Sequence, residues 1–111
     1  MLIHAGYEIT YGCPQPTPMI LTLSVHPSRI TDLLNPDRVM FDPPIPANTY
    51  HDSFGNFCHV ISAPAGGLTM RTDFKIRDSG LPDDVAPDAP QHALGDLPVD
   101  VLLFLLGSRY C

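Results

Sequence analysis

Cys58 and His59 are the only adjacent thiol and imidazole in the chain, and they are the first candidates for chemistry. A cysteine hydrolase needs a thiolate, a histidine within hydrogen-bond reach and a third group that orients the histidine. The residues around this pair predict a β-strand, on which neighbouring side chains point to opposite faces. Cys58 also lacks the helix N-terminus or the cationic neighbours that activate a thiol. We therefore expect no catalytic residue in this chain.

The histidines do not form a metal-binding motif. No His-x-His, His-x-x-x-His or Cys-x-x-Cys spacing occurs, although zinc sites commonly use these spacings. Strand pairing could still bring some histidines together, but solvated or locally hydrogen-bonded histidines are the favoured interpretation. Asp52 and Asn56 around Gly55 only partly match a calcium loop, which needs several more oxygen ligands. We expect no metal and no cofactor. The histidines are His4, His26, His51, His59 and His92.

The charge balance argues against a polyanionic partner. Six lysines and arginines stand against twelve aspartates and glutamates, which gives a formal net charge of −6. Nucleic acids and anionic membranes both require a basic patch on the protein that binds them. We therefore expect neither nucleic acid nor membrane as a partner.

The sequence indicates a cytoplasmic protein. The N-terminus has no basic and apolar leader, and the longest apolar run, residues 101–106, is far shorter than the ~20 residues that span a bilayer. Three cysteines without a close-spaced pair argue against a secreted disulfide framework. Cys13 and Cys58 are expected to be small buried hydrophobic residues.

Alternation of apolar and polar residues predicts β-strands through the first two thirds of the chain. In residues 2–11 the apolar side chains fall on every second position, which is typical of a half-buried strand. Residues 68–77 repeat this pattern, and residues 29–37 are expected to cross irregularly between strands. Strands are predicted at residues 2–11, 19–26, 38–42, 48–52, 56–62 and 68–77.

Two turns connect the central strands. Asp52 opens the first turn and Gly55 is free to adopt positive φ at its close, which favours a hairpin with a glycine bulge. Residues 65–67 are expected to form a second tight hairpin turn, and the first two strands to pair with each other. This pattern predicts a mainly β fold, an antiparallel β-sandwich of about six strands with a short C-terminal helix.

The character of the sequence changes after the last strand. We expect a β-sandwich domain at residues 1–78, an acidic, proline-rich connector at 79–95, and a C-terminal helix with a domain junction at 96–111. Asp96 is the expected N-cap of this helix, Pro98 lies in its first turn and Gly107 ends it. An apolar strand is the alternative for the same segment.

The predicted helix is apolar on every side. Such a helix needs partners on more than one face, and a single sandwich covers one face. We therefore expect that the chain is one module of a larger protein, and that an exposed segment here would support a homo-oligomer.

Several motifs, in this order, resemble the N-terminal domain of bacterial transglutaminase-like cysteine peptidases. The resemblance covers nearly the whole chain, and it rests on the order and spacing of the motifs together. These motifs are Tyr7-Glu8-Ile9-Thr10-Tyr11, Pro18 with Leu21-x-Leu23-x-x-His26-Pro27-Ser28, Asp52-Ser53-Phe54-Gly55-Asn56, Ala63-Pro64 with Leu68-x-Met70, and Phe104-Leu105-x-x-Ser108-Arg109-Tyr110.

The resemblance implies a non-catalytic accessory domain. In that family a Cys-His-Asp triad acts on acyl or amide bonds, and it lies in the domain that follows this one. No catalytic role carries over, because Cys111 falls at the junction without the sequence that surrounds the family's nucleophile. The implied partner is a downstream catalytic domain of the same protein. Support by packing, substrate presentation and partner contact all stay open as the role of the β-domain.

Two other classes of function remain open. One is a protein-binding module that acts through a sheet edge or through the apolar helix, with the prolines near residues 14–18 and 43–46 protecting some edges. The other is a free-standing small enzyme or metalloprotein. Exposure of the C-terminal leucines would favour the binding module over the other classes. A covered helix would argue against it, because it leaves no apolar surface for a partner.

Overall fold

The computed structural model describes residues 1–107. Two compact units make up the chain, Met1–Gly80 and Leu81–Cys111. Ser108, Arg109, Tyr110 and Cys111, which carry part of the family resemblance and the expected junction, lie outside the described residues.

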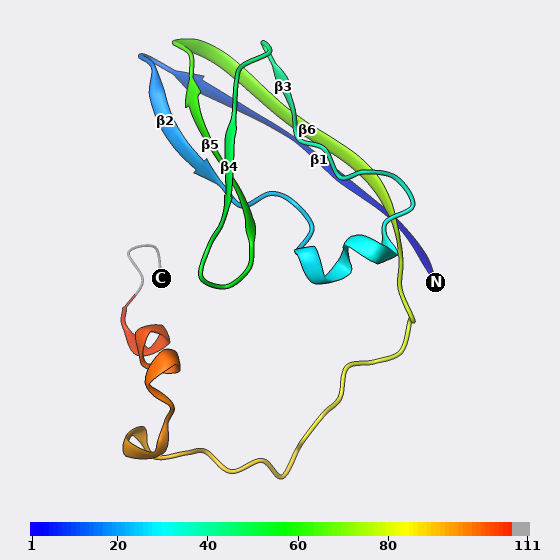
Figure 1. Ribbon diagram of the computed structural model, residues 1–111, viewed down its shortest axis with the longest axis vertical. Coiled ribbons are helices and arrows are strands. Elements are labelled where there is room, and N and C mark those ends of the chain that lie inside the picture. The colour runs from blue at the N-terminus through cyan, green and yellow to red at the C-terminus, as the bar shows by residue number, and fades with distance from the viewer. Residues whose placement is uncertain (108–111) are drawn as a thin grey trace. The chain divides into compact units, whose positions relative to one another are not determined.

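The first unit is a β-sandwich (Figure 1), and the predicted fold class is confirmed. Two antiparallel sheets of three strands each have the orders β1-β6-β3 and β2-β5-β4. All six strands pair in antiparallel fashion. The strands are β1 (Leu2–Cys13), β2 (Thr17–Leu21), β3 (Met40–Asp42), β4 (Asn48–His51), β5 (Phe57–Ala63) and β6 (Gly66–Arg77).

The longest strand pairing joins the first and last strands of the unit. β1 pairs with β6 from Leu2 opposite Arg77 to Cys13 opposite Gly66. Inward and outward positions alternate along both strands, as the sequence predicted. Gly6 lies so close to β6 that a Cβ atom there would be 2.4 Å from the carbonyl oxygen of Thr72. The absence of a side chain at this position lets the two strands approach.

Two of the expected pairings are wrong. The first two strands do not pair with each other, and β5 and β6 do not form a hairpin, because each of these pairs is divided between the two sheets. Pro14, Pro16 and Pro18 lack backbone donors, so the chain leaves the ladder after β1 and starts a new sheet at β2. Pro64 likewise ends the pairing of β5 before the chain crosses to β6. β4 and β5 form the hairpin that was predicted.

The turn of that hairpin has the predicted geometry. Gly55 has φ of +81°. The carboxylate of Asp52 accepts hydrogen bonds from the backbone N–H groups of Phe54 and Asn56, each at 2.9 Å. The Asn56 side-chain amide donates a third bond to Asp52 at 2.9 Å. These bonds explain why aspartate opens the turn, and they direct its oxygens to the turn itself.

The core of the sandwich lies between the two sheets. Ala63, Leu68 and Met70 are fully buried at its centre. Half-buried apolar side chains, among them Ile9 and Phe41, surround them. The rest of the buried apolar cluster consists of Cys13, Leu21 and Ile61.

The irregular crossing is the segment between β2 and β3, residues 22–39, and it contains a short 3₁₀ helix, η1 (Pro27–Asp32). His26 caps it by accepting a hydrogen bond from Ser28 N–H, and a bridge from Leu33 to Ile76 fixes the following turn to β6. Asn35 then accepts a bond from Lys75 N–H at 2.8 Å. Because the crossing is tied to β6 at several points, it forms one wall of the unit rather than a loose loop.

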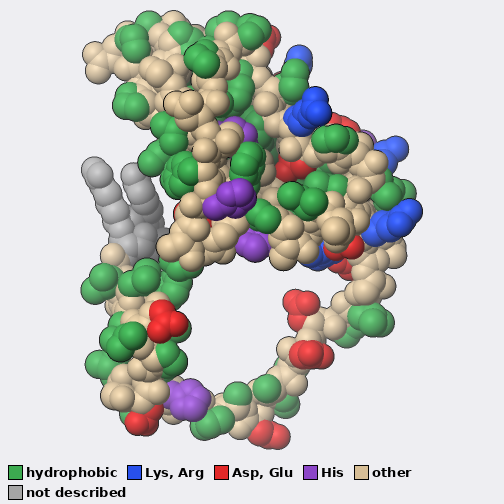
Figure 2. Space-filling model, in the orientation of Figure 1, with side chains coloured by type: hydrophobic (Ala, Val, Ile, Leu, Met, Phe, Trp, Pro, Cys, Tyr) green, Lys and Arg blue, Asp and Glu red, His purple; other side chains and the backbone are tan. Residues whose placement is uncertain are grey.

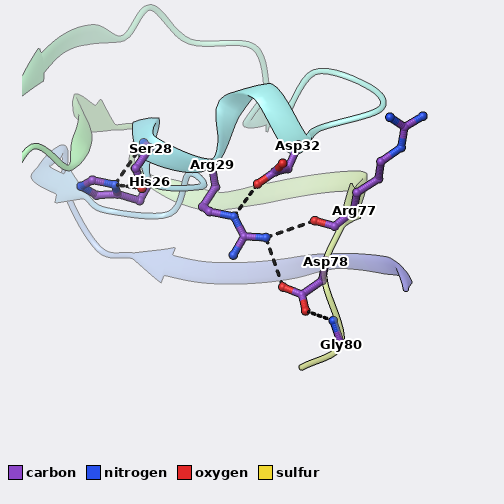
Figure 3. A network of polar contacts seen from close by, with 7 residues as sticks. All are labelled: His26, Ser28, Arg29, Asp32, Arg77, Asp78 and Gly80. Carbon is purple, nitrogen blue, oxygen red and sulfur yellow. Dashed lines mark hydrogen bonds and ion pairs between the residues drawn. The ribbon is translucent and has the colours of Figure 1, made fainter. Parts of the chain in front are cut away.

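Arg29 attaches η1 to the end of β6 (Figure 3). Its Nε atom donates to Asp32 at 2.6 Å, and its Nη2 atom donates to Asp78 and to the carbonyl of Arg77, each at 3.1 Å. Asp78 in turn accepts a bond from Gly80 N–H at 2.8 Å. The network fixes the point at which the chain leaves the sandwich.

Within residues 81–107 the predicted C-terminal segment is helical rather than a strand, but it does not form the single helix expected at residues 96–106. Two 3₁₀ helices take its place, η2 (Leu94–Asp96) and η3 (Val99–Leu105). Asp96 ends η2, and Pro98 stands at the N-cap of η3, so the expected capping by Asp96 is wrong. Pro98 forces the preceding Leu97 into an extended conformation, with φ of −79° and ψ of 139°, and this separates the two helices.

Candidate functional site

An open pocket of about 620 Å³ lies in the first unit, where the irregular crossing meets the β4–β5 hairpin. Its lining is mostly apolar, and its volume falls within the range of small-molecule sites. No local sequence pattern predicts this pocket, because its lining comes from three separate stretches of chain. The residues that line it are Ser24, Val25, Pro27, Ile30, Leu33, Leu34, Asn35, Pro36, Asp37, Arg38, His51 and Phe57.

Asp37 is the acidic group of this pocket. Its carboxylate accepts a hydrogen bond from the hydroxyl of Thr72 on β6, at 3.0 Å, and a short one from the backbone N–H of Val25, which follows β2. Asp37 therefore connects β6 to the segment that follows β2. Among residues 1–107 the ion pairs involve other carboxylates, so the charge of Asp37 has no cationic partner there.

Three buried polar atoms around this region have no hydrogen-bond partner within the described part of the chain: the Tyr7 hydroxyl, the Ser24 hydroxyl and His59 Nδ1. Burial, together with the charge of Asp37, raises the pKa of Tyr7 to about 12. Burial also lowers the pKa of His59 from 6.5, and the charge of Asp37 opposes that shift. Of the three, Ser24 lines the pocket.

Cys58 and His59 lie on opposite faces of β5. His59 shares the core face with Ile61 and Ala63, and its ring packs edge-on against Phe57 with centroids 5.1 Å apart. Cys58 is 2% exposed on the other face. The two side chains do not converge into a nucleophile and base.

The hairpin turn covers the thiol of Cys58. Its Sγ atom lies 3.6 Å from the carbonyl of Asn56 and 4.0 Å from the carboxylate of Asp52. Thr22 contributes a third contact at 3.9 Å. Burial and a hydrogen bond to Cys58 raise the pKa of Tyr50. The atoms that contact this thiol are therefore acidic and hydroxylic. The His26 ring lies against the same turn, with its Nε2 atom 3.2 Å from the carbonyl of Phe54.

The histidines are dispersed over the chain. His4 bonds to Asp73 at 2.7 Å on an exposed strand face, and His26 caps η1. His51 packs against Phe57, with ring centroids 5.4 Å apart, and His92 lies in the second unit. Within residues 1–107 no three histidine, cysteine or acidic side chains stand close enough to hold a metal ion.

The C-terminal apolar segment is a second candidate surface. No residue of η3 is buried, and Figure 2 shows apolar side chains along this part of the chain. Leu103 is 52% exposed, Leu105 57% and Leu106 76%. The second unit by itself therefore does not bury these leucines.

The free edge of β1 is a third candidate. The sheet order places β1 at one edge of its sheet, and β1 carries no proline along its 12 residues. The prolines that were expected to protect edges lie in β2 and in the connections on either side of the strands. An edge without proline presents unpaired backbone groups that another strand could join.

Comparison of the chain with known protein families, curated proteins and solved structures found no match. The resemblance to transglutaminase-like peptidases therefore stays a prediction from sequence. Within the described residues no helix is both long and apolar enough to cross a membrane.

Proposed function

We propose that this chain is a non-catalytic β-sandwich module of a transglutaminase-like cysteine hydrolase, and that it contacts protein through the segment Val99–Leu106. The observation that carries the proposal is that the second unit by itself buries no residue of η3. Contiguous apolar surface of several hundred Å² on a monomer commonly marks an interaction site. A catalytic domain downstream in the same protein is the partner that the sequence resemblance implies.

The geometry of the only adjacent thiol and imidazole supports an accessory role. Cys58 and His59 lie on opposite faces of β5, and the thiol contacts Asp52, Asn56 and Thr22 rather than His59. A Cys-His mechanism needs the two groups within hydrogen-bond reach. The proposal accordingly expects no acyl-transfer or amide-hydrolase activity from this chain.

The experiment measures self-association of the full chain by light scattering across a range of concentrations. Without its partner domain, the exposed leucines are expected to drive concentration-dependent association. Leu103→Glu combined with Leu105→Glu should abolish it. Val85→Glu is the matched control, because Val85 is 80% exposed in the same unit but lies outside the apolar segment.

Two results would contradict the proposal. One is a chain that stays monomeric at every concentration and whose leucine segment is protected from amide hydrogen exchange. The other is thiol-dependent hydrolysis that Cys58→Ala abolishes.

A second function, strand addition at the edge of β1, is favoured by the length of that edge and its lack of proline. Gly12→Lys tests it, because no atom lies within 4 Å of a Cβ at Gly12 and an edge lysine disfavours strand pairing. Gly95→Lys is the control in the second unit, where a Cβ is equally unobstructed. Association that only Gly12→Lys suppresses would favour the edge over the leucine segment.

A further inference from the structure

We propose that the pocket between the irregular crossing and the β4–β5 hairpin binds a small organic ammonium, that is, a protonated amine carried on an apolar body. This inference does not rest on the proposed function, because the pocket lies in the first unit and the leucine segment in the second. It follows from the shape of the pocket, its apolar walls and the charge on one of them.

The walls supply the apolar part of the site. Ile30, Leu33 and Leu34 line one side, and Phe57 contributes an aromatic ring from β5. The pocket volume of about 620 Å³ accommodates a small aromatic or aliphatic molecule. An apolar ligand gains roughly 25 cal/mol for each Å² of apolar surface that leaves water.

Asp37 supplies the charge. Its carboxylate lines the pocket, is half-buried and has no cationic partner among residues 1–107. It accepts one hydrogen bond at each oxygen, from Thr72 and from Val25, and a carboxylate has about four acceptor positions. Each oxygen therefore retains acceptor capacity for an ammonium N–H.

The remaining polar side chains of the lining are Ser24, Asn35, Arg38 and His51. The Asn35 amide is bonded to β6, and the His51 ring packs against Phe57. The buried hydroxyl of Ser24 has no partner within the described residues, so it is available as an acceptor for a second ammonium N–H. Arg38 also lines the pocket, but it is exposed, and solvent screens exposed charges more strongly than half-buried ones. The net preference of the pocket is therefore for a cation with an apolar body.

The test titrates the full chain with three matched probes and follows backbone amide shifts by NMR. The probes are 2-phenylethylamine, its neutral analogue 2-phenylethanol and the anion 3-phenylpropanoate. We expect the amine to bind in the millimolar range or tighter, with shifts at Ser24, Leu33 and Phe57. The alcohol should bind at least roughly tenfold more weakly, because it loses the charge-assisted hydrogen bond to Asp37. The anion should bind least.

Two variants locate the site. Asp37→Asn should bring the affinity for the amine close to that for the alcohol. Because Asp37 also connects β6 to the segment after β2, its substitution is expected to affect stability, and a second variant keeps these bonds. Ile30→Lys places a cation on a wall residue that is 57% exposed, and it should repel the amine. Ile20→Lys is its control, since Ile20 is 68% exposed on β2 and does not line the pocket.

Each outcome of these titrations either supports or overturns the proposal. Amine binding that Ile30→Lys weakens and Ile20→Lys preserves supports the proposal. Equal affinities for the amine and the alcohol would show a purely apolar pocket, and tighter binding of the anion would show that Arg38 dominates. Either result, or no shift with any probe at millimolar concentration, overturns the assignment.

Discussion

The carboxylate of Asp37 accepts a hydrogen bond from the hydroxyl of Thr72 at 3.0 Å, and this contact joins the irregular crossing to the central strand β6. Thr72 is 6% exposed, so its hydroxyl has little access to water. The other oxygen of Asp37 accepts from Val25 N–H, which belongs to the chain leaving the opposite sheet. One acidic side chain therefore positions the pocket wall with respect to both sheets.

Thr72→Val is expected to destabilise the first unit by about 1–2 kcal/mol, because it preserves the shape of the side chain and removes the donor to a half-buried carboxylate. Urea denaturation measures the change. Thr69→Val is the control on the same strand, because the Thr69 hydroxyl bonds to Thr10 on the exposed side and its loss should cost little. Equal effects of the two substitutions would contradict a special role for the contact with Asp37.

The alternation in β1 and β6 predicted the faces of these strands correctly, because one face of each is buried and local sequence records that burial. The partner strands could not be predicted in the same way. β1 pairs with β6, more than 50 residues away, and nothing within either strand specifies that partner. The adjacent strands were expected to pair, yet the prolines at 14, 16 and 18 carry the chain into the other sheet.

The pocket could not be predicted from the sequence for the same reason. Ser24, Asp37 and Phe57 are distant in sequence and come together only when the crossing packs beside the hairpin. The C-terminal segment is the opposite case, because its division depends on a residue within the segment itself. Pro98 restricts Leu97 to an extended conformation, and this effect divided the predicted helix.

Gly6→Ala is expected to destabilise the sandwich by about 1–3 kcal/mol. The added Cβ would stand 2.4 Å from the carbonyl oxygen of Thr72, so the β1–β6 ladder would have to separate locally. Thermal unfolding followed by circular dichroism measures the loss. Gly12→Ala is the matched control, because it lies on the same strand and its Cβ would meet no atom within 4 Å. Unfolding of both variants at the same temperature would contradict the close approach of β1 and β6 at Gly6.

Arg29→Ala is expected to loosen the attachment of η1 to the end of β6. The substitution removes the bonds to Asp32, to Asp78 and to the carbonyl of Arg77. Because the guanidinium is in contact with solvent, we expect faster amide hydrogen exchange in residues 27–34 rather than unfolding of the whole unit. Arg71→Ala, at an exposed position on β6, is the control and should leave this exchange unchanged.

Rapid exchange confined to that segment in Arg29→Ala would match the expected effect. Global unfolding, or exchange identical to that of the unsubstituted chain, would contradict it. Since residues of η1 line the pocket, the same variant should also broaden the NMR signals of Ile30 and Leu33.

The stability of the first unit is expected to fall as the pH drops below about 6.5, in part because of His59. Burial lowers the pKa of this imidazole from 6.5 in the folded protein, against the smaller opposing effect of Asp37. As the pH falls, the unfolded chain therefore takes up the proton before the folded one does, and unfolding becomes more favourable. The loss begins near pH 6.5 and is complete below the folded-state pKa.

His59→Phe keeps an aromatic ring against Phe57 and should flatten this part of the pH profile. His92→Asn, at an exposed position in the second unit, should leave the profile unchanged. Urea denaturation at several pH values between 5 and 8 measures all three profiles. A profile of His59→Phe with the original slope would show that another group governs the titration.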